Sequence, residues 1–534
     1  MNNTLYLDVS SYKNDSSQVA IYFRKKKITF AEFNQRIDVM AKKLYKIGIR
    51  NDTVVTILSP NVPEAVVTLY ALNKIGAIVS ILHPLIPVKG LRESIMMTQS
   101  EFTLILDARY FEYKEELDKI NQKVYFISAE PELGFFEKKA FKKKFAKQLS
   151  IVDKKYILNS LSILTREEAE SEFDINTDDE KTSIYLRSGG TSGRSKTIIL
   201  SDKAIRHPGN CANEILGRDI KGLTMIGVLP LFHGFGLAMG VHAPLMNNTA
   251  TYLMMKFDVD EIVSAINKNQ INLLVGVPYM IEKLVHNPKF KKAKLDNLYM
   301  TFVGADKVKK SLIDEFDELM KAHKSINRLY EGYGLTETVT VGVVNTIKNR
   351  KIGSVGKPIS GVSIKIVNPD DRRIEMPVGQ DGEILLTGIN NCLGYLNCDK
   401  RHQPFFTDSH KVTYVCTGDI GYLDNEGYLF FKNRNNDMIK IAGFNVFPSD
   451  IEKLSNEIEG VVDSAAIFVD DETHPYIHLY IENHSVDDKI LVERVMKHLS
   501  ENLIKYSLPE KVTCLPHFPR TAVGKIDRKS LIHF

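Results

Sequence analysis

Residues 188–197 combine the residue types that bind phosphate. They read Ser-Gly-Gly-Thr-Ser-Gly-Arg-Ser-Lys-Thr and contain no apolar side chain. The glycines let the backbone turn sharply and bring its N–H groups close to a ligand, and Arg194 and Lys196 add positive charge. Successive N–H groups of this kind form an anion-binding nest. The segment therefore predicts a loop that wraps phosphate oxygens, with a flexible surface linker as the alternative.

The same loop is one glycine short of the P-loop pattern, because Gly190 is followed by four residues and then by Ser195-Lys196-Thr197. A P-loop leads from a strand directly into a helix, whereas residues 184–186 and 197–200 are both strand-like. Ser201 then has the character of a cap for a later helix. A loop between two strands indicates a mobile flap over a polyphosphate and argues against a Walker-type cradle.

Four further segments carry residues suited to nucleotide chemistry. Residues 331–338 read Glu-Gly-Tyr-Gly-Leu-Thr-Glu-Thr, in which Tyr333 offers a flat face to a purine and Glu337 offers a carboxylate to a hard cation. Asp419, at a turn, is an acceptor for the two hydroxyls of a ribose. Arg434 stands at a polar joint, and Lys525 lies on a glycine turn near the C-terminus. Taken alone, Asp419 is typical of a turn residue and Lys525 of an exposed lysine.

Together and in this order, the five segments resemble the ANL superfamily of adenylate-forming enzymes. That superfamily includes acyl- and aryl-CoA synthetases, adenylation domains of nonribosomal peptide synthesis and firefly luciferase. The resemblance covers nearly the whole chain and is greatest to acyl-CoA synthetases and fatty-acyl-CoA ligases. It implies that ATP activates a carboxylic acid to an acyl-adenylate, and that the acyl group then passes to the thiol of CoA with release of AMP. The implied cofactors are ATP, Mg2+ and CoA.

The resemblance also implies a role for individual residues. The loop that closes on the β- and γ-phosphates would contain Ser188, Gly190, Thr191, Ser192, Gly193 and Lys196. Mg2+ would be placed by Thr191 and Glu337. The adenine would be flanked by Gly304, Ala305, Glu331, Gly332 and Tyr333, with Gly334 in the same cofactor-binding segment. Thr336 would approach the α-phosphate, and the ribose would be held by Asp419 and Arg434. Lys525 would bridge the substrate carboxylate and the α-phosphate, and Gly443 lies in the segment that family members present during thioester formation.

The sequence departs from the family pattern at the flap and at the joint. Ser195 stands where proline is usual and Thr197 where glycine is common, which predicts a stiffer or slower flap. Asn436 occupies the pivot position that normally holds aspartate or lysine. Asparagine tolerates unusual backbone angles, so we expect domain rotation with an altered equilibrium.

Residues 229–237, Leu-Pro-Leu-Phe-His-Gly-Phe-Gly-Leu, resemble the pocket entrance of acyl-CoA synthetases. Amino-acid-activating domains usually place an aspartate hereabouts to pair with the substrate ammonium, and this segment has none. The predicted substrate is therefore a small carboxylic acid, fatty or otherwise acyl or aromatic, and not an amino acid. His233 is expected to line or gate the pocket, with a purely structural histidine as the alternative.

The expected acceptor is free CoA, and a separate acyl carrier protein is the alternative within the class. Three alternative functions are amino-acid adenylation, a luciferase-like oxygenase activity and non-catalytic regulation by nucleotide binding. Retention of Lys196, Glu337, Asp419, Arg434 and Lys525 argues against the regulator.

The order of the expected elements predicts the fold class. A chain of 534 residues exceeds what one core serves. Helix and strand patterns alternate over residues 1–110, beginning with a capping box at Thr29 and Glu32, and resume at 224–229, 273–277 and 300–303, which predicts doubly wound α/β sheets. A β-rich stretch follows over 353–431. We expect a large N-terminal domain, 1–434, of doubly wound sheets with a β-rich subdomain, and a small mobile α+β domain, 435–534.

Composition limits the class of protein and its partners. The chain is 43% hydrophobic and 25% charged, which excludes general disorder, and its net charge of +4 gives no reason to expect nucleic-acid binding. The five cysteines are scattered, which indicates reduced thiols and no structural zinc. The N-terminus lacks the regions of a signal peptide, and no apolar run approaches the roughly 18 residues of a transmembrane segment. We therefore expect a soluble, cytoplasmic protein.

Overall fold

The computed structural model describes most of the chain. The described residues are 3–188, 196–305, 308, 310–369, 371–434, 439–441, 444–446, 448–470, 474–484, 486–519, 526 and 528–532. Their contacts divide the chain into two compact units. The larger consists of Met1–Pro84, Ile95–Arg187 and Thr197–Asn433, and the smaller of Leu85–Ser94, Ser188–Lys196 and Arg434–Phe534. A domain boundary after residue 434, and a mobile second domain, stay predictions.

A nine-stranded sheet occupies one half of the larger unit, in the order β16-β15-β14-β13-β12-β10-β11-β1-β2. Its strands are β1 (Val19–Phe23), β2 (Lys26–Thr29), β10 (Thr224–Gly227), β11 (Ala250–Leu253), β12 (Leu273–Gly276), β13 (Met300–Val303), β14 (Leu329–Tyr333), β15 (Val343–Val344) and β16 (Lys357–Pro358). The strands from β14 to β1 are parallel to their neighbours. The predicted strand at 300–303 is β13, with the same bounds.

An eight-stranded sheet, β19-β9-β8-β4-β3-β5-β6-β7, forms the second layer of the doubly wound fold. Its strands are β3 (Val54–Leu58), β4 (Ile78–Ile81), β5 (Phe102–Leu106), β6 (Lys123–Ile127), β7 (Ile157–Leu158), β8 (Thr182–Ser188), β9 (Lys196–Ser201) and β19 (Gly394–Tyr395). Strands β3, β4 and β5 are almost continuous apolar runs because both faces of a parallel sheet are covered. Strand β9 follows residues 189–195 directly, as the two-strand interpretation of that loop requires.

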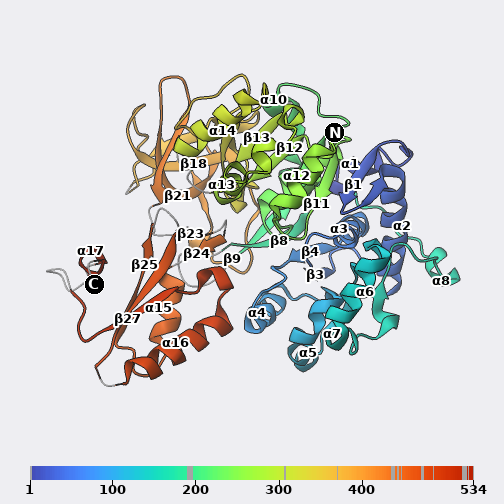
Figure 1. The fold of residues 1–534 in the computed structure, drawn as a ribbon, viewed down its shortest axis with the longest axis horizontal. Coiled ribbons are helices and arrows are strands. Elements are labelled where there is room, and N and C mark those ends of the chain that lie inside the picture. Colours follow the sequence, from blue (N-terminus) through green and yellow to red (C-terminus); the bar gives the residue numbers. More distant parts are fainter. Residues whose placement is uncertain are drawn as a thin grey trace. The chain divides into compact units, whose positions relative to one another are not determined.

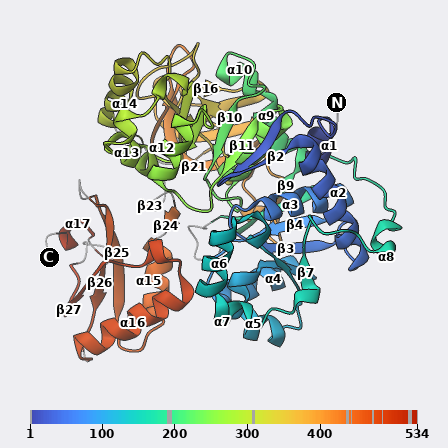
Figure 2. The same ribbon diagram turned by 45° about the vertical axis from the view of Figure 1, so that its right-hand side comes forward.

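The α-helices of residues 1–322 lie among these strands in the sequence. They are α1 (Leu5–Ser10), α2 (Phe30–Lys46), α3 (Pro63–Ile75), α4 (Val88–Thr98), α5 (Tyr110–Lys119), α6 (Phe135–Lys144), α7 (Ala146–Leu149), α8 (Arg166–Ala169), α9 (Asp202–Asn210), α10 (Ala212–Leu216), α11 (Ala243–Met246), α12 (Val259–Asn267), α13 (Pro278–Val285) and α14 (Lys310–Ala322). A π-helical turn spans Gly236–His242. Helices α12, α13 and α14 lie beside the nine-stranded sheet in two views (Figure 1, Figure 2).

Helix α2 shows how the sequence specifies this packing. The Thr29 side chain accepts a hydrogen bond from the backbone N–H of Glu32, which is the N-cap half of the predicted capping box, while the Glu32 carboxylate accepts from Arg36. The side chains of Phe33, Ile37 and Met40 recur at helical spacing and are fully buried in the core of the larger unit. At the end of the following helix, α3, Gly76 adopts the left-handed conformation (φ 87°) that stops the helix.

A five-stranded antiparallel sheet forms the predicted β-rich part of the larger unit. It contains β17 (Val362–Val367), β18 (Gly382–Gly388), β20 (Phe405–Thr407), β21 (Thr413–Leu423) and β22 (Leu429–Arg434). Strand β22 includes the first two residues of the predicted polar joint, Asn433 and Arg434. The rest of that joint, including Asn436, lies outside the described residues.

The C-terminal part of the smaller unit is the expected α+β fold. Its elements are β23 (Ile439–Ile441), β24 (Phe444–Val446), α15 (Pro448–Asn456), β25 (Asp463–Val469), β26 (Tyr476–Glu482), α16 (Asp488–Asn502), β27 (Lys511–Leu515) and α17 (Arg528–Leu531). Leu491, Val495, Leu499 and Leu503 have the spacing of one helical face; the first three are fully buried in α16, whereas Leu503 follows the helix in an extended conformation. Among the described residues, no helix is both long and apolar enough to cross a membrane.

Candidate functional site

The carboxyl ends of two parallel strands, β13 and β14, bring the predicted adenine-flanking residues together. Val303 and Glu331 are register partners, so Gly304 lies beside Gly332. A Cβ atom on Gly304 would lie 3.0 Å from the carbonyl oxygen of Gly332, so a larger residue there would crowd the neighbouring backbone. Ala305 has a positive φ of 68°, a conformation that is unfavourable for any residue but glycine. Ligands of open α/β sheets bind beyond such carboxyl ends.

Glu331 is half-buried at the end of β14. Burial raises the pKa of its carboxyl group to about 7, and the nearby positive charge of Arg350 opposes part of that effect. The group therefore titrates close to neutral pH. Its surroundings disfavour an isolated negative charge at this position.

Tyr333 and Asp419 form a hydrogen-bonded pair within the larger unit. The Tyr333 hydroxyl donates to Oδ2 of Asp419 over 2.7 Å. Asp419 lies in β21 and is only 4% exposed. Its backbone N–H donates to the hydroxyl of Thr417 over 3.0 Å, and the preceding Gly418 has a φ of 68°. The structure thus places an anionic acceptor and an aromatic ring side by side, as ribose and adenine recognition would require.

The turn that follows Tyr333 is tightly packed and strained. A Cβ atom on Gly334 would lie 2.6 Å from the backbone of Thr340. Val339 and Thr340 have positive φ angles of 47° and 63°, which β-branched residues rarely adopt. The buried amide of Asn390 holds this turn by donating to the carbonyl oxygens of Thr338 and Val341, over 2.8 and 3.0 Å. Backbone strain held in place this way is a common feature of functional sites.

Glu337 extends from the same turn. The hydroxyl of Tyr395, in β19, donates to Oε1 of Glu337 over 2.7 Å. Burial and the negative charge of Glu337 raise the pKa of Tyr395, so its proton stays on the phenol and the hydrogen bond orients the carboxylate. The backbone N–H of Cys392 donates to the Glu337 carbonyl over 2.7 Å. A fixed, half-buried carboxylate of this kind fits the hard oxygen donor set that Mg2+ prefers.

The predicted pocket-entrance segment, residues 229–237, packs against this turn. A Cβ atom on Gly234 would lie 3.1 Å from Cγ2 of Thr340, and Phe235 lies 3.8 Å from the Cβ position of Gly304. His233 has a local structural contact, because its Nδ1 accepts from the backbone N–H of Phe235 over 3.2 Å. The rings of Phe232 and His83 lie 4.5 Å apart. The segment is therefore positioned beside the strand ends that carry the other predicted residues.

Sequence reasoning missed several residues that position this site. Asn61 fixes the entrance segment by donating to the carbonyl oxygens of Gly227 and Leu229. Burial lowers the pKa of His83 to about 4, with a smaller contribution from Arg109. Tyr395 and Asn390 hold the turn. The one available signal was that His83 follows a strand, β4, at its carboxyl end.

Several predicted residues lie outside the described part of the chain. They are Gly190, Thr191, Ser192, Gly193, Gly443 and Lys525. Lys196 begins β9, Ser188 ends β8 and Arg434 ends β22. Thr336 begins the 3-10 turn Thr336–Thr338. The structure thus brings together Gly304, Ala305, Glu331, Gly332, Tyr333, Gly334, Glu337, Asp419 and the 229–237 segment.

Comparison with known proteins identifies the family. A family model described as AMP-binding enzyme matches residues 9–396. A 4-coumarate–CoA ligase-like protein of Arabidopsis thaliana is 26% identical over 520 residues, which cover 95% of this chain and 88% of that protein. A 2-succinylbenzoate–CoA ligase of Lactococcus lactis is 26% identical over 505 residues, which cover 94% of this chain and 95% of that protein. A solved structure of o-succinylbenzoate CoA synthetase from Bacillus subtilis has a TM-score of 0.80 at 20% identity, covering 100% of this chain and 98% of that one.

The chain belongs to the AMP-binding enzyme family. The predicted superfamily of adenylate-forming enzymes is therefore confirmed, and so is the α/β fold with its smaller C-terminal part. The predicted enzyme class, an acid–thiol ligase, is confirmed as well.

Proposed function

We propose, starting from this family membership, that the protein activates a hydrophobic carboxylic acid with ATP and transfers the acyl group to the thiol of CoA. The observation that carries the proposal is the Tyr333–Asp419 pair at the glycine-lined ends of β13 and β14. An aromatic face, a close backbone approach and a buried carboxylate are the parts that a bound adenosine needs. The glycines leave room for the base, and Asp419 accepts hydrogen bonds from the ribose hydroxyls.

The chemical problem in the first step is charge. A substrate carboxylate attacks the α-phosphorus of ATP, and both reactants are anionic. Glu337, oriented by Tyr395, would hold Mg2+ together with Thr191, and the ion would supply positive charge to the phosphates. Lys196 and Lys525 would add two further positive charges, and Thr336 would donate to the α-phosphate. Pyrophosphate leaves and an acyl-adenylate remains.

In the second step a thiol displaces AMP from the acyl-adenylate. The sulfur attacks the acyl carbon, the acyl–phosphate bond breaks, and a thioester and AMP are the products. The family relation favours CoA as the thiol, with a separate acyl carrier protein as the alternative acceptor. Gly443 and its neighbours would face the thiol during this step. We propose the cytoplasm as the compartment, because all five cysteines are free thiols.

The entrance segment supports an acid without an ammonium group. Residues 229–237 contain no acidic side chain that could pair with one, and Phe232 and Phe235 present apolar rings. Two classes of acid fit this chemistry. Fatty acids are the class that the resemblance of the sequence motifs implies, and aryl acids are suggested by relatives whose names contain succinylbenzoate and coumarate. The proposal covers both, and the experiment separates them.

The test is a screen for pyrophosphate release with ATP and Mg2+ across fatty, aryl and amino acids, with and without CoA. Product thioesters are identified by mass. We expect release with one class of fatty or aryl acid, formation of its CoA ester and AMP, and no turnover of amino acids. Release of ADP and phosphate, or selective activation of amino acids, would contradict the proposal. Pyrophosphate release that is independent of CoA and yields no CoA ester would indicate a carrier protein as the acceptor.

A further inference from the structure

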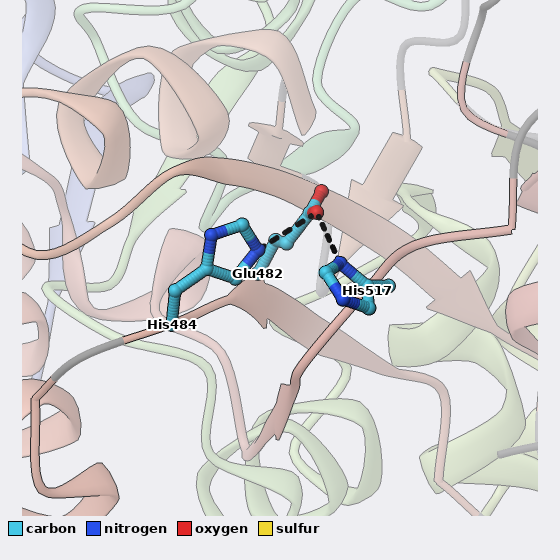
Figure 3. Close-up of side chains that lie close together, drawn as sticks. All are labelled: Glu482, His484 and His517. Carbon is cyan, nitrogen blue, oxygen red and sulfur yellow. Dashed lines mark hydrogen bonds and ion pairs between the residues drawn. The ribbon is translucent and has the colours of Figure 1, made fainter.

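Three side chains that could bind a metal ion meet at the edge of the C-terminal sheet. Strand β26 pairs in parallel with β27, and Glu482 is the register partner of Leu515. The next backbone bond of this ladder runs from the N–H of Asn483 to the carbonyl of Leu515. His484 and His517 each follow their paired strand end by two residues, so the register places them beside each other and beside Glu482 (Figure 3).

The distances within this cluster suit a shared ion. Nε2 of His484 lies 3.3 Å from Oε1 of Glu482, and Nδ1 of His517 lies 3.6 Å from the same oxygen. All three ligand atoms lie within 4.8 Å of one another. A tetrahedral zinc ion with bonds of about 2.1 Å separates its ligand atoms by roughly 3.4 Å. Only small side-chain rotations are therefore needed to close the three atoms around one ion.

Burial gives the cluster an anchored side and an accessible side. The Glu482 side chain is 6% exposed, whereas those of His484 and His517 are 44% and 80% exposed. The carboxylate is thus fixed by the strand, while the imidazoles are open to solvent and to an entering ion. Figure 3 shows both rings directed toward the carboxylate.

We propose that Glu482, His484 and His517 bind a divalent transition-metal ion of the zinc class, with water in the remaining position. Two neutral imidazoles and one carboxylate match the donors that zinc, copper and nickel prefer. Mg2+ and Ca2+ favour all-oxygen sites, so the ion of this site differs from the Mg2+ proposed for the nucleotide. The site belongs to the C-terminal sheet and does not depend on the proposed function.

The alternative is a pair of ordinary ion pairs between protonated histidines and Glu482. One carboxylate would then balance two positive charges that lie close together, with the rings 4.9 Å apart. A metal ion instead uses the neutral rings and removes the repulsion between them.

The test is a titration of the tag-free, full-length chain with Zn2+ after chelator dialysis, followed by calorimetry. We expect a site of one ion per chain whose affinity falls by about tenfold or more in His484→Ala and again in His517→Ala. The matched control is His474→Ala, which removes another exposed histidine, located just before β26 and paired with a glutamate, Glu510, at 2.9 Å. The His474→Ala variant should bind Zn2+ with the affinity of the wild type.

A second readout identifies the ligands directly. Co2+ in a site of low coordination number gives intense visible absorption, which we expect in the wild type and His474→Ala and not in the His484→Ala, His517→Ala double variant. Both histidines are exposed, so their replacement should leave the fold intact. Circular dichroism spectra of the variants should therefore match that of the wild type. Equal Zn2+ affinity in the wild type and the double variant, or no binding by the wild type, would overturn the proposal.

Discussion

At the scale of single residues, the proposed nucleotide site rests on Asp419 and Tyr333. They meet although 86 positions separate them in sequence. Each was singled out by its type and by its neighbours, an acid after a glycine turn and an aromatic ring between glycines. The hydrogen bond between them could not be predicted, because it depends on how β21 packs against β14.

Asp419→Asn tests the role of the carboxylate. The substitution keeps the shape of the side chain and removes the charge, and a hydrogen bond to a charged group contributes about 1.5–3 kcal/mol. We expect kcat/KM for ATP to fall by about 10- to 100-fold in pyrophosphate release. Asp424→Asn, which alters an ion pair with Lys351 just beyond the same strand, is the control and should leave this value unchanged. Equal losses in both variants would indicate a structural role for Asp419.

Glu331 provides a pH-dependent test. Its folded-state pKa is raised from 4.5 to about 7, so the folded protein binds this proton more tightly than the unfolded chain does. Stability from this group is therefore present below about pH 4.5 and is lost as the pH rises through about 7. Glu331→Gln removes the cost of a buried charge and should raise the melting temperature at pH 8 by roughly 2 °C or more. At pH 5 the two proteins should melt together. An equal change in melting temperature at pH 5 and pH 8 would contradict a raised pKa for Glu331.

At the scale of elements, the strained turn after β14 fixes Glu337 and the entrance segment. The helices and strands around it follow from apolar periodicity, capping residues and glycines, which the sequence shows directly. The contacts that hold the turn do not follow from these local patterns. Tyr395 is 58 positions from its partner Glu337, and Asn390 is 52 positions from its partner Thr338. The cluster of Glu482, His484 and His517 is hidden for the same reason, since only the parallel register of β26 and β27 joins its two histidines.

Gly334→Ala tests the importance of this turn. Its Cβ atom would lie 2.6 Å from the Thr340 backbone, so the turn must shift and move Glu337 with it. We expect a loss of adenylation of about 100-fold, since small misplacements of catalytic groups are costly. Gly342→Ala is the matched control, because its Cβ would have no neighbour closer than 3.6 Å. If both variants keep wild-type activity, the turn does not set the site geometry.

At the scale of the whole molecule, we propose from the resemblance to adenylate-forming enzymes that the C-terminal domain takes different positions in the two half-reactions. Lys525 is expected to act only in the first. Lys525→Ala should abolish formation of the acyl-adenylate and spare thioester formation from a supplied acyl-adenylate. The two rates are measured separately, by pyrophosphate release and by the appearance of the CoA ester. Equal loss of both would show that Lys525 has another role.

The fold class was accessible from the sequence because it rests on local patterns, and the residues of the proposed nucleotide site were selected from local patterns as well. The acid was not accessible, because its identity depends on contacts between segments that are distant in sequence, such as the contact between the rings of His83 and Phe232. The predicted effects of Ser195 on the flap and of Asn436 on the equilibrium of domain rotation stay predictions, because both residues lie outside the described part of the chain.

The most direct test of the central claim is carboxylate-dependent exchange between ATP and labelled pyrophosphate in the absence of CoA. Exchange isolates the reversible formation of an acyl-adenylate from every later step. We predict label in ATP only when the acid, ATP and Mg2+ are all present, and a loss of exchange in Asp419→Asn. Formation of the CoA ester without any such exchange, or exchange that needs no acid, would contradict adenylate formation at the ends of β13 and β14.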